Sequence, residues 1–387
     1  MDTPAEPPVV ASYCATFLKP EMLHIYRQIT ALDRVRPLVI AQKRENAERF
    51  AFDPLTIVAK PATHFLRRIW FRQLRDVPWM ISRGETTQLM RVLDAADARL
   101  LHIYFGHIAV HLLPLIEQWR RPSVVSFHGA DVGVDLEKPA YRAAAMRMLD
   151  AVRLVLVRSE SLREALVRLG CLSEKIRIQR TGIPLDNFAF QTRSWPTDGA
   201  WNLLQTCRLI SKKGLQTSLR AFAKFAREHP RAQFTIAGEG PLLVDLQKTA
   251  ADLRIADRVT FTGFASQAEL RELFYRSHIF LHPSETTADG NQEGVPNSML
   301  EAMATGLPVF ATRHGGIPEA IEHRASGILV AERDADAIAQ ELLTAAANPE
   351  QLTQIAKHGA ESVAETFEQR AQVRQLEQHY FDAIAAT

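Results

Sequence analysis

Short apolar runs alternate with helix-like segments along the whole chain, and this alternation restricts the fold more than any other feature of the sequence. The runs of the first half lie at residues 9–11, 38–41, 101–104, 124–127, 154–157 and 176–178. After a polar, turn-rich stretch at 190–200, further runs lie at residues 202–207, 234–238, 259–263, 279–284, 307–312 and 327–330. Strands that alternate with helices form parallel sheets. The sequence therefore predicts an α/β protein with one domain over 1–190 and a second over 200–364.

The composition excludes several classes of protein. With 387 residues, of which 47% are hydrophobic and 23% charged, the chain can build two cores and is neither disordered nor fibrous. A formal charge of +2 gives no reason to expect nucleic acid as a partner. The 3 cysteines form no CxxC pair, which argues against a zinc site or a disulfide framework. No apolar run approaches the roughly 20 residues of a membrane-spanning helix, so we expect a cytoplasmic protein, free or bound to a membrane surface.

Two acidic residues flank a predicted helix start in the second domain. Glu301 follows Glu293 by 301 − 293 = 8 positions, and the helix begins between them, near 296–298. Backbone amides of Gly294, Val295 and Asn297 are then unpaired donors near a helix N-terminus, where a diphosphate is favoured. The two carboxylates can accept hydrogen bonds from sugar hydroxyls. An ordinary buried βα unit explains the apolar positions of this stretch but not both acids.

The stretch from Glu293 to Glu319 resembles the donor-site signature of retaining glycosyltransferases of family 4. The resemblance rests on the spacing of two acids, several small residues, a Pro-Val pair and a Gly-Gly pair: Glu293, Glu301, Ala302, Gly306, Pro308, Val309, Gly315, Gly316 and Glu319. The preceding segment, 282–303, looks most like members that build bacterial exopolysaccharides. The resemblance implies the GT-B fold, with two facing Rossmann-like domains, a cleft between them, and a terminal helix, about 365–387, that crosses back to the first domain.

A basic loop after the first strand of the second domain complements these acids. Arg208 and Lys213 lie where a strand gives way to a helix, at the edge of the sheet where α/β proteins bind ligands. In family 4 a similar R-L-x-x-x-K-G pattern grips the donor diphosphate, whereas Lys212 is left without a role. The resemblance also puts Phe264 along the nucleotide base. The donor-binding residues that we predict are Arg208, Lys213, Phe264, Glu293, Gly294, Val295, Pro296, Asn297 and Glu301.

The first domain is predicted to bind the acceptor. His128 follows a predicted strand directly and is followed by a glycine-bearing loop. By resemblance, His128 bonds a hydroxyl of the donor sugar, and the catalytic set comprises His128, Glu293, Arg208 and Lys213. Gly129 and Asp131 are expected on the acceptor side, with His107 as a weaker candidate. A lone histidine is also a common structural hydrogen-bond partner.

No catalytic metal and no cofactor are expected. Asp334 and Asp336 form a DxD pair, which in a different glycosyltransferase fold binds a metal. Here the pair lies immediately before a predicted helix. We therefore interpret it as a helix cap.

Residues 64–83 interleave arginines with Trp70, Phe71 and Trp79. One interpretation is a basic amphipathic helix that rests on an anionic membrane surface. The other is a solvated arginine face over a packed aromatic stripe.

The sequence as a whole predicts transfer of a hexose from a nucleotide diphosphate sugar to a hydroxyl of a glycan or lipid-linked glycan, with retention of configuration, in surface polysaccharide synthesis. Two alternatives stay open. One is another enzyme on the same fold, either a sugar-nucleotide epimerase or a disaccharide synthase. The other is a non-catalytic scaffold that binds nucleotide sugars.

Overall fold

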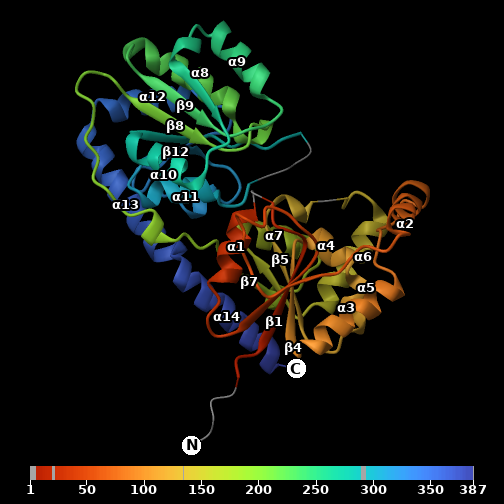
Figure 1. Cartoon of the computed structure of the whole chain (residues 1–387). Helices are drawn as coiled ribbons and strands as arrows, with labels where there is room; N and C mark the ends of the chain where they lie inside the picture. Colours follow the sequence, from red (N-terminus) through yellow and green to blue (C-terminus); the bar gives the residue numbers. More distant parts are fainter. Residues whose placement is uncertain (1–5, 20–21, 134, 289–292, 387) are drawn as a thin grey trace, which may run out of the picture. The chain divides into compact units, whose positions relative to one another are not determined.

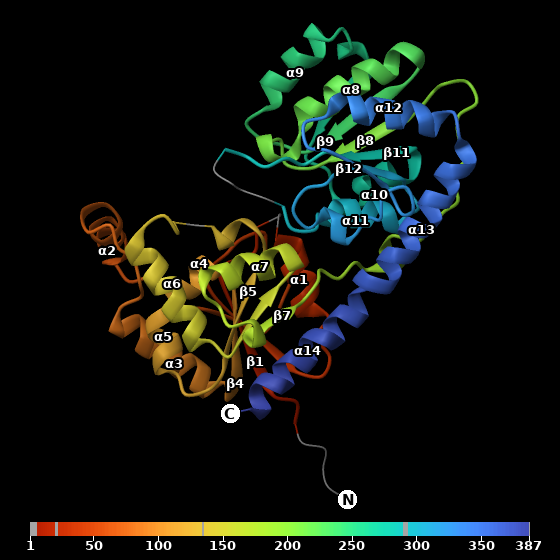
Figure 2. The same cartoon turned by 180° about the vertical axis from the view of Figure 1, so that it is seen from behind.

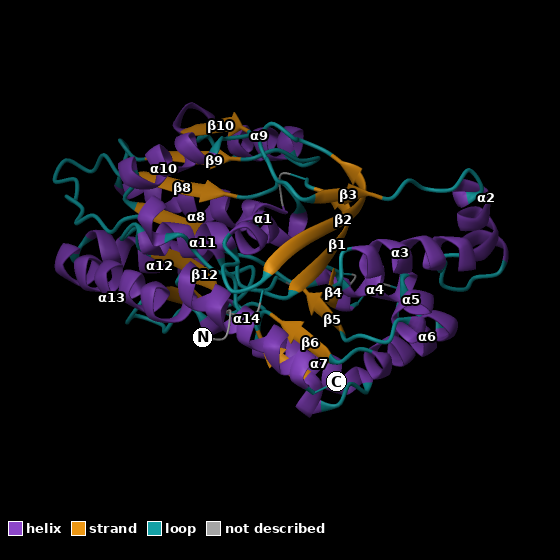
Figure 3. Cartoon of the chain, turned by 60° about the horizontal axis from the view of Figure 1, so that its bottom comes forward, coloured by secondary structure: helices purple, strands orange, loops and turns teal. Residues whose placement is uncertain are grey.

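The chain forms two compact units, each built on one parallel sheet. The computed structural model describes residues 6–19, 22–133, 135–288 and 293–386. The first unit comprises residues 1–182 and 369–387, and the second comprises 183–368. Figure 1 labels their elements, and Figure 3 distinguishes strands from helices.

The sheet of the first unit has the order β3-β2-β1-β4-β5-β6-β7, and each neighbouring pair is parallel. Its strands are β1 (Val9–Phe17), β2 (Arg36–Arg44), β3 (Leu55–Ile57), β4 (Ala98–Tyr104), β5 (Ser123–Phe127), β6 (Leu154–Val157) and β7 (Ile176–Ile178). Its helices are α1 (Leu23–Thr30), α2 (His64–Ile69), the π-helical turn η2 (Trp70–Leu74), α3 (Arg83–Ala95), α4 (Gly106–His111), α5 (Leu113–Gln118), η3 (Ala130–Val132), α6 (Pro139–Ala151), α7 (Glu160–Leu169), η4 (Ser173–Lys175) and α14 (Gln369–Ala385). The order reverses between β1 and β4, which is where a doubly wound sheet binds ligands.

The sheet of the second unit has the order β10-β9-β8-β11-β12-β13, again parallel throughout. Its strands are β8 (Asn202–Thr206), β9 (Gln233–Ala237), β10 (Val259–Gly263), β11 (Ile279–His282), β12 (Val309–Thr312) and β13 (Ile328–Val330). Its helices are η5 (Leu185–Asn187), η6 (Ser211–Lys213), α8 (Leu215–Glu228), α9 (Leu243–Asp252), η7 (Ala256–Arg258), α10 (Gln267–Arg276), α11 (Asn297–Ala304), η8 (Ile317–Glu319), α12 (Ala335–Ala346) and α13 (Pro349–Phe367). This is the Rossmann order, with the reversal between β8 and β11.

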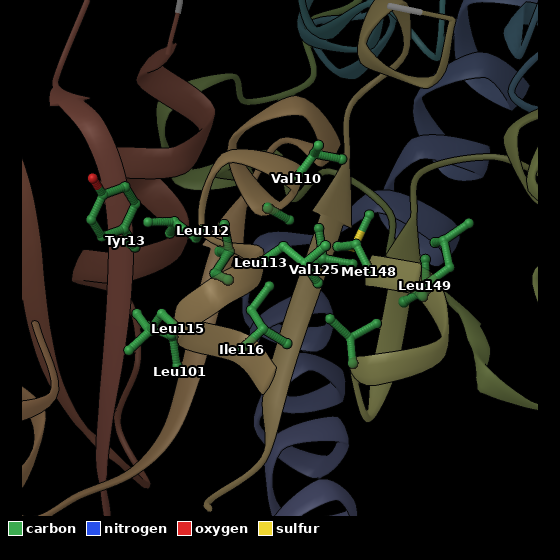
Figure 4. Close-up of a cluster of buried hydrophobic side chains, with 14 of the residues drawn as sticks. Tyr13, Leu101, Val110, Leu112, Leu113, Leu115, Ile116, Val125, Met148 and Leu149 are labelled. Carbon is green, nitrogen blue, oxygen red and sulfur yellow. The ribbon is translucent and has the colours of Figure 1, made fainter. Parts of the chain in front are cut away.

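Both faces of the first sheet are buried, which explains why its strands read as continuous apolar runs. Successive strand residues point to opposite faces, so Leu101 joins the cluster on one face and Leu100 the cluster on the other. Figure 4 shows the first cluster, in which Leu113 and Ile116 of α5 pack with Leu101. Helix α14 covers the opposite face through Leu376 and Tyr380 (Figure 2). The last helix of the chain therefore completes the core of the first unit.

The boundaries between the units differ from those that the sequence suggests. The turn-rich stretch 190–200 belongs to the second unit, because the Arg193 guanidinium donates hydrogen bonds to the carbonyl oxygens of Thr305 and Gly306 at 3.1 and 2.9 Å. Phe188 and Phe367 are also buried in the core of that unit. The crossover to α14 comes at Glu368, whose extended backbone separates α13 from α14.

The single amphipathic helix that one of the two interpretations places over 64–83 is not formed. Helix α2 has 6 residues, the π-helical turn η2 adds 5, and Asp76 then adopts a positive φ of 47°. Pro78 cannot donate a helical hydrogen bond. Ser82 starts α3 through a capping box with Glu85. The aromatic side chain of Trp79 does not belong to a lipid-facing stripe but lies between other rings of the unit.

Buried neutral histidines make the stability of both units depend on pH. His102 and His282 are fully buried, and burial lowers the pKa of each to about 3. Below about pH 6.5 the unfolded chain binds a proton at each histidine that the folded unit does not, so stability is lost as the pH falls. Between pH 7.5 and 5.5 we expect each histidine to lower the free energy of unfolding of its unit by roughly 1.4 kcal/mol. Urea unfolding at both pH values checks this, with His282→Gln as the comparison. An equal pH dependence in that variant would contradict the assignment for the second unit.

Candidate functional site

Two loops meet at the point where the strand order of the second unit reverses. One follows β8 and the other follows β11. Gly214, in the first loop, has a φ of +60°, and a Cβ atom there would lie 1.7 Å from the Pro283 carbonyl oxygen in the second. The amide of Glu285 donates to the Lys212 carbonyl oxygen at 2.9 Å. The two loops are therefore held in direct backbone contact at the edge where ligands bind.

A carboxylate between two lysines lies at this junction. Glu293 Oε1 is 2.8 Å from Lys213 Nζ and 3.4 Å from Lys212 Nζ, and the three side chains are between 10 and 12% exposed. Burial alone would raise the pKa of Glu293, but Lys213 and then Lys212 lower it to about 2. Arg208, which is exposed, forms no ion pair with any described residue. Lys212, Lys213 and Arg208 thus bring three cations to this loop, which suits a diphosphate.

A hydrogen bond to His314 fixes the backbone at Glu293. The Glu293 amide donates to His314 Nε2 at 2.9 Å, so the proton of the neutral ring resides on Nδ1, which lies 2.7 Å from Glu332 Oε1. Gly315, with a φ of +51°, permits this approach, because a Cβ atom there would lie 2.1 Å from the Glu293 carbonyl oxygen. Neither His314 nor Glu332 was among the site residues predicted from the sequence. The only local signal was the position of His314 directly before the Gly-Gly pair.

Helix α11 begins at Asn297 with Pro296 at its N-cap, as predicted. The Ser298 hydroxyl donates to the Thr206 carbonyl oxygen at 3.0 Å, which fastens the first turn of the helix to the end of β8. Glu301 is buried one turn further on. The predicted amide donors at Gly294, Val295 and Asn297 lie between Glu293 and this turn. Residues 289–292, part of the segment that resembles exopolysaccharide enzymes, lie outside the described residues.

Several polar atoms at the ends of β8 and β11 are buried without a hydrogen-bond partner among the described residues. They are Thr206 Oγ1, both ring nitrogens of His282, and Ser284 Oγ. Because its pKa is depressed by burial, the His282 ring is neutral. Unsatisfied polar groups are rare in folded proteins and gather at functional sites.

Phe264 and the turn at 237–241 complete this edge of the sheet. Phe264 follows β10 and is 52% exposed, so its ring is accessible to a flat ligand. Gly238 approaches the loop after β8 so closely that a Cβ atom would lie 1.8 Å from the Cys207 carbonyl oxygen. The glycine is thus explained by chain packing.

The matching edge of the first unit contains His128. Its Nε2 shares a hydrogen bond with Ser126 Oγ at 2.9 Å, and its Nδ1 shares one with His24 Nε2 at 3.2 Å. Burial, followed by the charge of Arg158, holds the pKa of His128 well below its usual value. The ring is therefore neutral and can exchange hydrogen bonds but carries no charge.

Asp131 joins two loops of the first unit. Its carboxylate accepts hydrogen bonds from the amides of His128 and Gly106, at 2.8 and 3.0 Å, and burial raises its pKa. Gly129 has a φ of +130°, which suits glycine at this turn. His107 lies on the exposed side of α4. Asp131 therefore shapes the loop through the hydrogen bonds that it accepts from backbone amides, whereas His107 is exposed.

Comparison with known proteins decides the family. The family model described as glycosyl transferases group 1 matches residues 191–362, and the one described as Glycosyltransferase Family 4 matches residues 23–187. The chain is 33% identical over 282 residues to the amylovoran biosynthesis glycosyltransferase AmsK of Erwinia amylovora, covering 73% of this chain and 69% of AmsK. The chain belongs to glycosyltransferase family 4.

Two further known proteins are similar to this chain, one in sequence and one in structure. The putative colanic acid biosynthesis glycosyltransferase WcaL of Escherichia coli K12 is 32% identical to this glycosyltransferase over 251 residues, which cover 65% of this chain and 62% of WcaL. The crystal structure of Anabaena Alr3699/HepE in complex with UDP matches with a TM-score of 0.77 at 17% identity, covering 97% of this chain and 100% of HepE. Together with the two parallel-sheet domains, this likeness confirms the predicted GT-B fold.

Lys213 and Glu293, which were both predicted as site residues, form an ion pair in the structure. Lys212, which had no predicted role, also pairs with Glu293. Asp334 of the DxD pair caps helix α12, because it accepts a hydrogen bond from the Ala337 amide at 2.8 Å, and Asp336 pairs with Lys224. Within the described ranges, no group of at least three His, Cys, Asp or Glu side chains is arranged to hold a metal ion. No helix in the described part of the chain is long and apolar enough to cross a membrane.

Proposed function

We propose that this glycosyltransferase moves a hexose from a nucleotide diphosphate sugar to a hydroxyl of a glycan or lipid-linked glycan, with retention of configuration, in exopolysaccharide synthesis. The observation that carries the proposal is the cluster of Lys212, Lys213 and Glu293 at the strand-order reversal of the second unit. The biosynthetic roles named for AmsK and WcaL support the class of acceptor.

In this proposal, the protein lowers the activation barrier by stabilising the negative charge that develops on the leaving diphosphate. Arg208 and Lys213 bind the diphosphate and stabilise the negative charge that develops as the sugar departs, an effect worth about 2.7 to 4 kcal/mol for a well-placed donor. Glu293 accepts hydrogen bonds from sugar hydroxyls, and Glu301 accepts them from the ribose. Neutral His128 bonds a sugar hydroxyl.

Retention follows from a same-face displacement, in which the leaving diphosphate takes the proton of the acceptor hydroxyl. In support of this route, the Glu293 carboxylate is ion-paired with two lysines, which lowers its nucleophilicity. Neither a metal ion nor a cofactor has a part in the proposed steps.

Product analysis tests this proposal. Purified protein is incubated with uridine, guanosine, adenosine and thymidine diphosphate sugars and a lipid-linked glycan acceptor, and the anomeric configuration of any product is read from its NMR coupling constants. We expect release of nucleoside diphosphate that depends on the acceptor, with the anomeric configuration of the donor retained. Donor isomerisation without acceptor would indicate an epimerase, transfer to a free sugar would indicate a disaccharide synthase, and binding without turnover would indicate a scaffold.

We also propose that α2 and η2 bind an anionic membrane surface that presents the acceptor, on the inner face of the membrane. Four large apolar side chains are exposed there: Phe65 by 68%, Leu66 by 69%, Trp70 by 49% and Leu74 by 67%. The Arg75 guanidinium lies 5.5 Å from the centre of the Trp70 ring. Exposed apolar groups beside cations are typical of interfacial segments. Figures 1 and 3 show α2 projecting from the rest of its unit.

Flotation with phospholipid vesicles checks the membrane proposal. We expect the protein to float with anionic vesicles and the Phe65→Ser/Leu66→Ser variant to lose at least about tenfold in binding, because each buried apolar side chain contributes roughly 1.5 to 3 kcal/mol. Val244→Ser, at a site 73% exposed on α9, is the matched control. Equal binding by the double variant, or equal binding to neutral vesicles, would contradict the proposal.

A further inference from the structure

A cavity of about 280 Å³ lies at the strand-order reversal of the first unit. Its walls include Ala15 at the end of β1, Gln42 at the end of β2, Lys60 after β3 and His107 after β4. Helix α2, the loop that contains Trp79, and parts of α4 and α6 form its other sides. These strands contribute their carboxyl ends, so the cavity occupies the position in which a doubly wound sheet binds ligands.

The cavity carries two cations without ion partners. Lys60 and Arg68 line it, and neither is paired with any described residue. The third cation of the wall, Lys138, is paired with Asp76 at 3.1 Å and Asp135 at 3.5 Å. The wall therefore offers two free positive charges, together with two carboxylates that retain capacity to accept hydrogen bonds.

Helix α2, which carries Arg68, is fixed in place through Arg67. The Arg67 guanidinium lies 2.8 Å from Glu85 Oε2 and donates to the Met80 carbonyl oxygen at 3.0 Å. This pairing fastens α2 to the start of α3. Arg67 therefore stabilises the fold, whereas the adjacent Arg68 lines the cavity.

Polar atoms with no partner gather around the same cavity. His64 Nδ1, Trp79 Nε1 and His111 Nε2 are buried and make no hydrogen bond within the described part of the chain, and all three residues line the wall. The rings are packed together, with centroids 4.3 Å apart for His64 and Trp79 and 4.1 Å apart for Trp79 and His111. Burial lowers the pKa of both histidines, so the rings are neutral. Such a wall suits a ligand that has many hydroxyls.

We propose that this cavity binds an anionic sugar residue of the acceptor, with its carboxylate or phosphate on Lys60 and Arg68 and its hydroxyls on Asp76 and Asp135. This inference rests on the proposed transfer to a glycan. It adds that the acceptor carries an acidic group, which this cavity of the first unit recognises. Lys60 and Arg68 favour an acidic sugar over a neutral one, because a neutral sugar would leave both cations without an ion partner.

Ligand-observed NMR titration of the full-length protein tests the proposal without requiring donor or turnover. The probes are methyl glucuronide, glucose 6-phosphate and neutral methyl glucoside. We expect one or both acidic probes to bind at least about tenfold more tightly than methyl glucoside, and a preference between them distinguishes a uronic acid from a sugar phosphate. Binding should weaken as salt is added.

Variants locate the binding. Arg68→Ala and Lys60→Ala should each weaken binding of the acidic probe about tenfold, while Arg75→Ala, at the end of η2 and outside the cavity, should leave it unchanged. Melting temperatures confirm that each variant is folded. Equal binding of acidic and neutral probes, or undiminished binding in Arg68→Ala, would overturn the inference. Donor binding measured on the same samples reports on the proposed function separately, because Arg208, Lys213 and Glu293 belong to the second unit.

Discussion

Alanine in place of Lys213 is expected to lower the rate of sugar transfer by about 10² to 10³, the usual cost of removing one well-placed group that stabilises charge in the transition state. In the structure, Lys213 Nζ is the cation closest to Glu293, at 2.8 Å. The variant loses the charge that would oppose the departing diphosphate. It also leaves Glu293 with Lys212 alone, at 3.4 Å. Steady-state kinetics with a saturating donor check the effect.

Lys224→Ala is the matched control for Lys213→Ala. Lys224 lies on α8, is partly exposed and pairs with Asp336, which is away from the junction of the two loops. Its removal should change the rate of sugar transfer by no more than about twofold, because exposed ion pairs contribute little. Equal rates for Lys213→Ala and Lys224→Ala would show that Lys213 takes no part in the chemistry.

Gly214→Ala should strongly destabilise the second unit and disrupt the predicted donor site. The new Cβ atom would lie 1.7 Å from the Pro283 carbonyl oxygen, and the φ of +60° is unfavourable for alanine. Relief requires the loops after β8 and β11 to separate, which also separates Lys213 from Glu293. We expect the free energy of unfolding to fall by roughly 2 to 4 kcal/mol, combining backbone strain and overpacking, and donor affinity to be lost. Urea unfolding and calorimetric titration with the donor measure the two effects.

Gly84→Ala provides the comparison for Gly214→Ala. A Cβ atom at Gly84 would meet only Ser82 Oγ, at 4.0 Å, within the first turn of α3. This variant should be as stable as the unchanged protein or slightly more stable. If Gly214→Ala keeps both stability and donor affinity, the close contact between the two loops does not form in solution.

The fold could be predicted from the sequence because each interior strand is buried on both faces and therefore forms a continuous apolar run. β5 and β6, which are buried throughout, are found where their apolar runs predict. The edge strand β3 was missed, since it has only 3 residues and its side chains are half-buried or exposed. A pattern of apolar residues also cannot reveal that Arg193 donates hydrogen bonds to carbonyl groups more than 80 positions away, and so the predicted linker at 190–200 is part of the second unit.

The candidate site was predicted through residues whose type and spacing carry the chemistry. Glu293 and Lys213 are recognisable in this way, and the structure brings them within 2.8 Å. His314 was missed because its role arises only when Gly315 lets the distant backbone of Glu293 approach its ring. The interpretation of 64–83 as one amphipathic helix was wrong, because α2 and α3 are separate helices. The spacing of apolar residues alone does not take into account that Pro78 interrupts a helix.

Calorimetric titration of nucleoside diphosphates tests the central claim most directly, which is that the strand-order reversal of the second unit binds a nucleotide diphosphate sugar. Uridine, guanosine, adenosine and thymidine diphosphates are titrated into the unchanged protein, Arg208→Ala, Glu301→Ala and the control Arg220→Ala, which alters an exposed arginine of α8. We predict that one base is preferred, that affinity falls at least about tenfold in Arg208→Ala and Glu301→Ala, and that Arg220→Ala binds normally. Undiminished binding in both site variants, or no binding of any diphosphate to the unchanged protein, would contradict the claim.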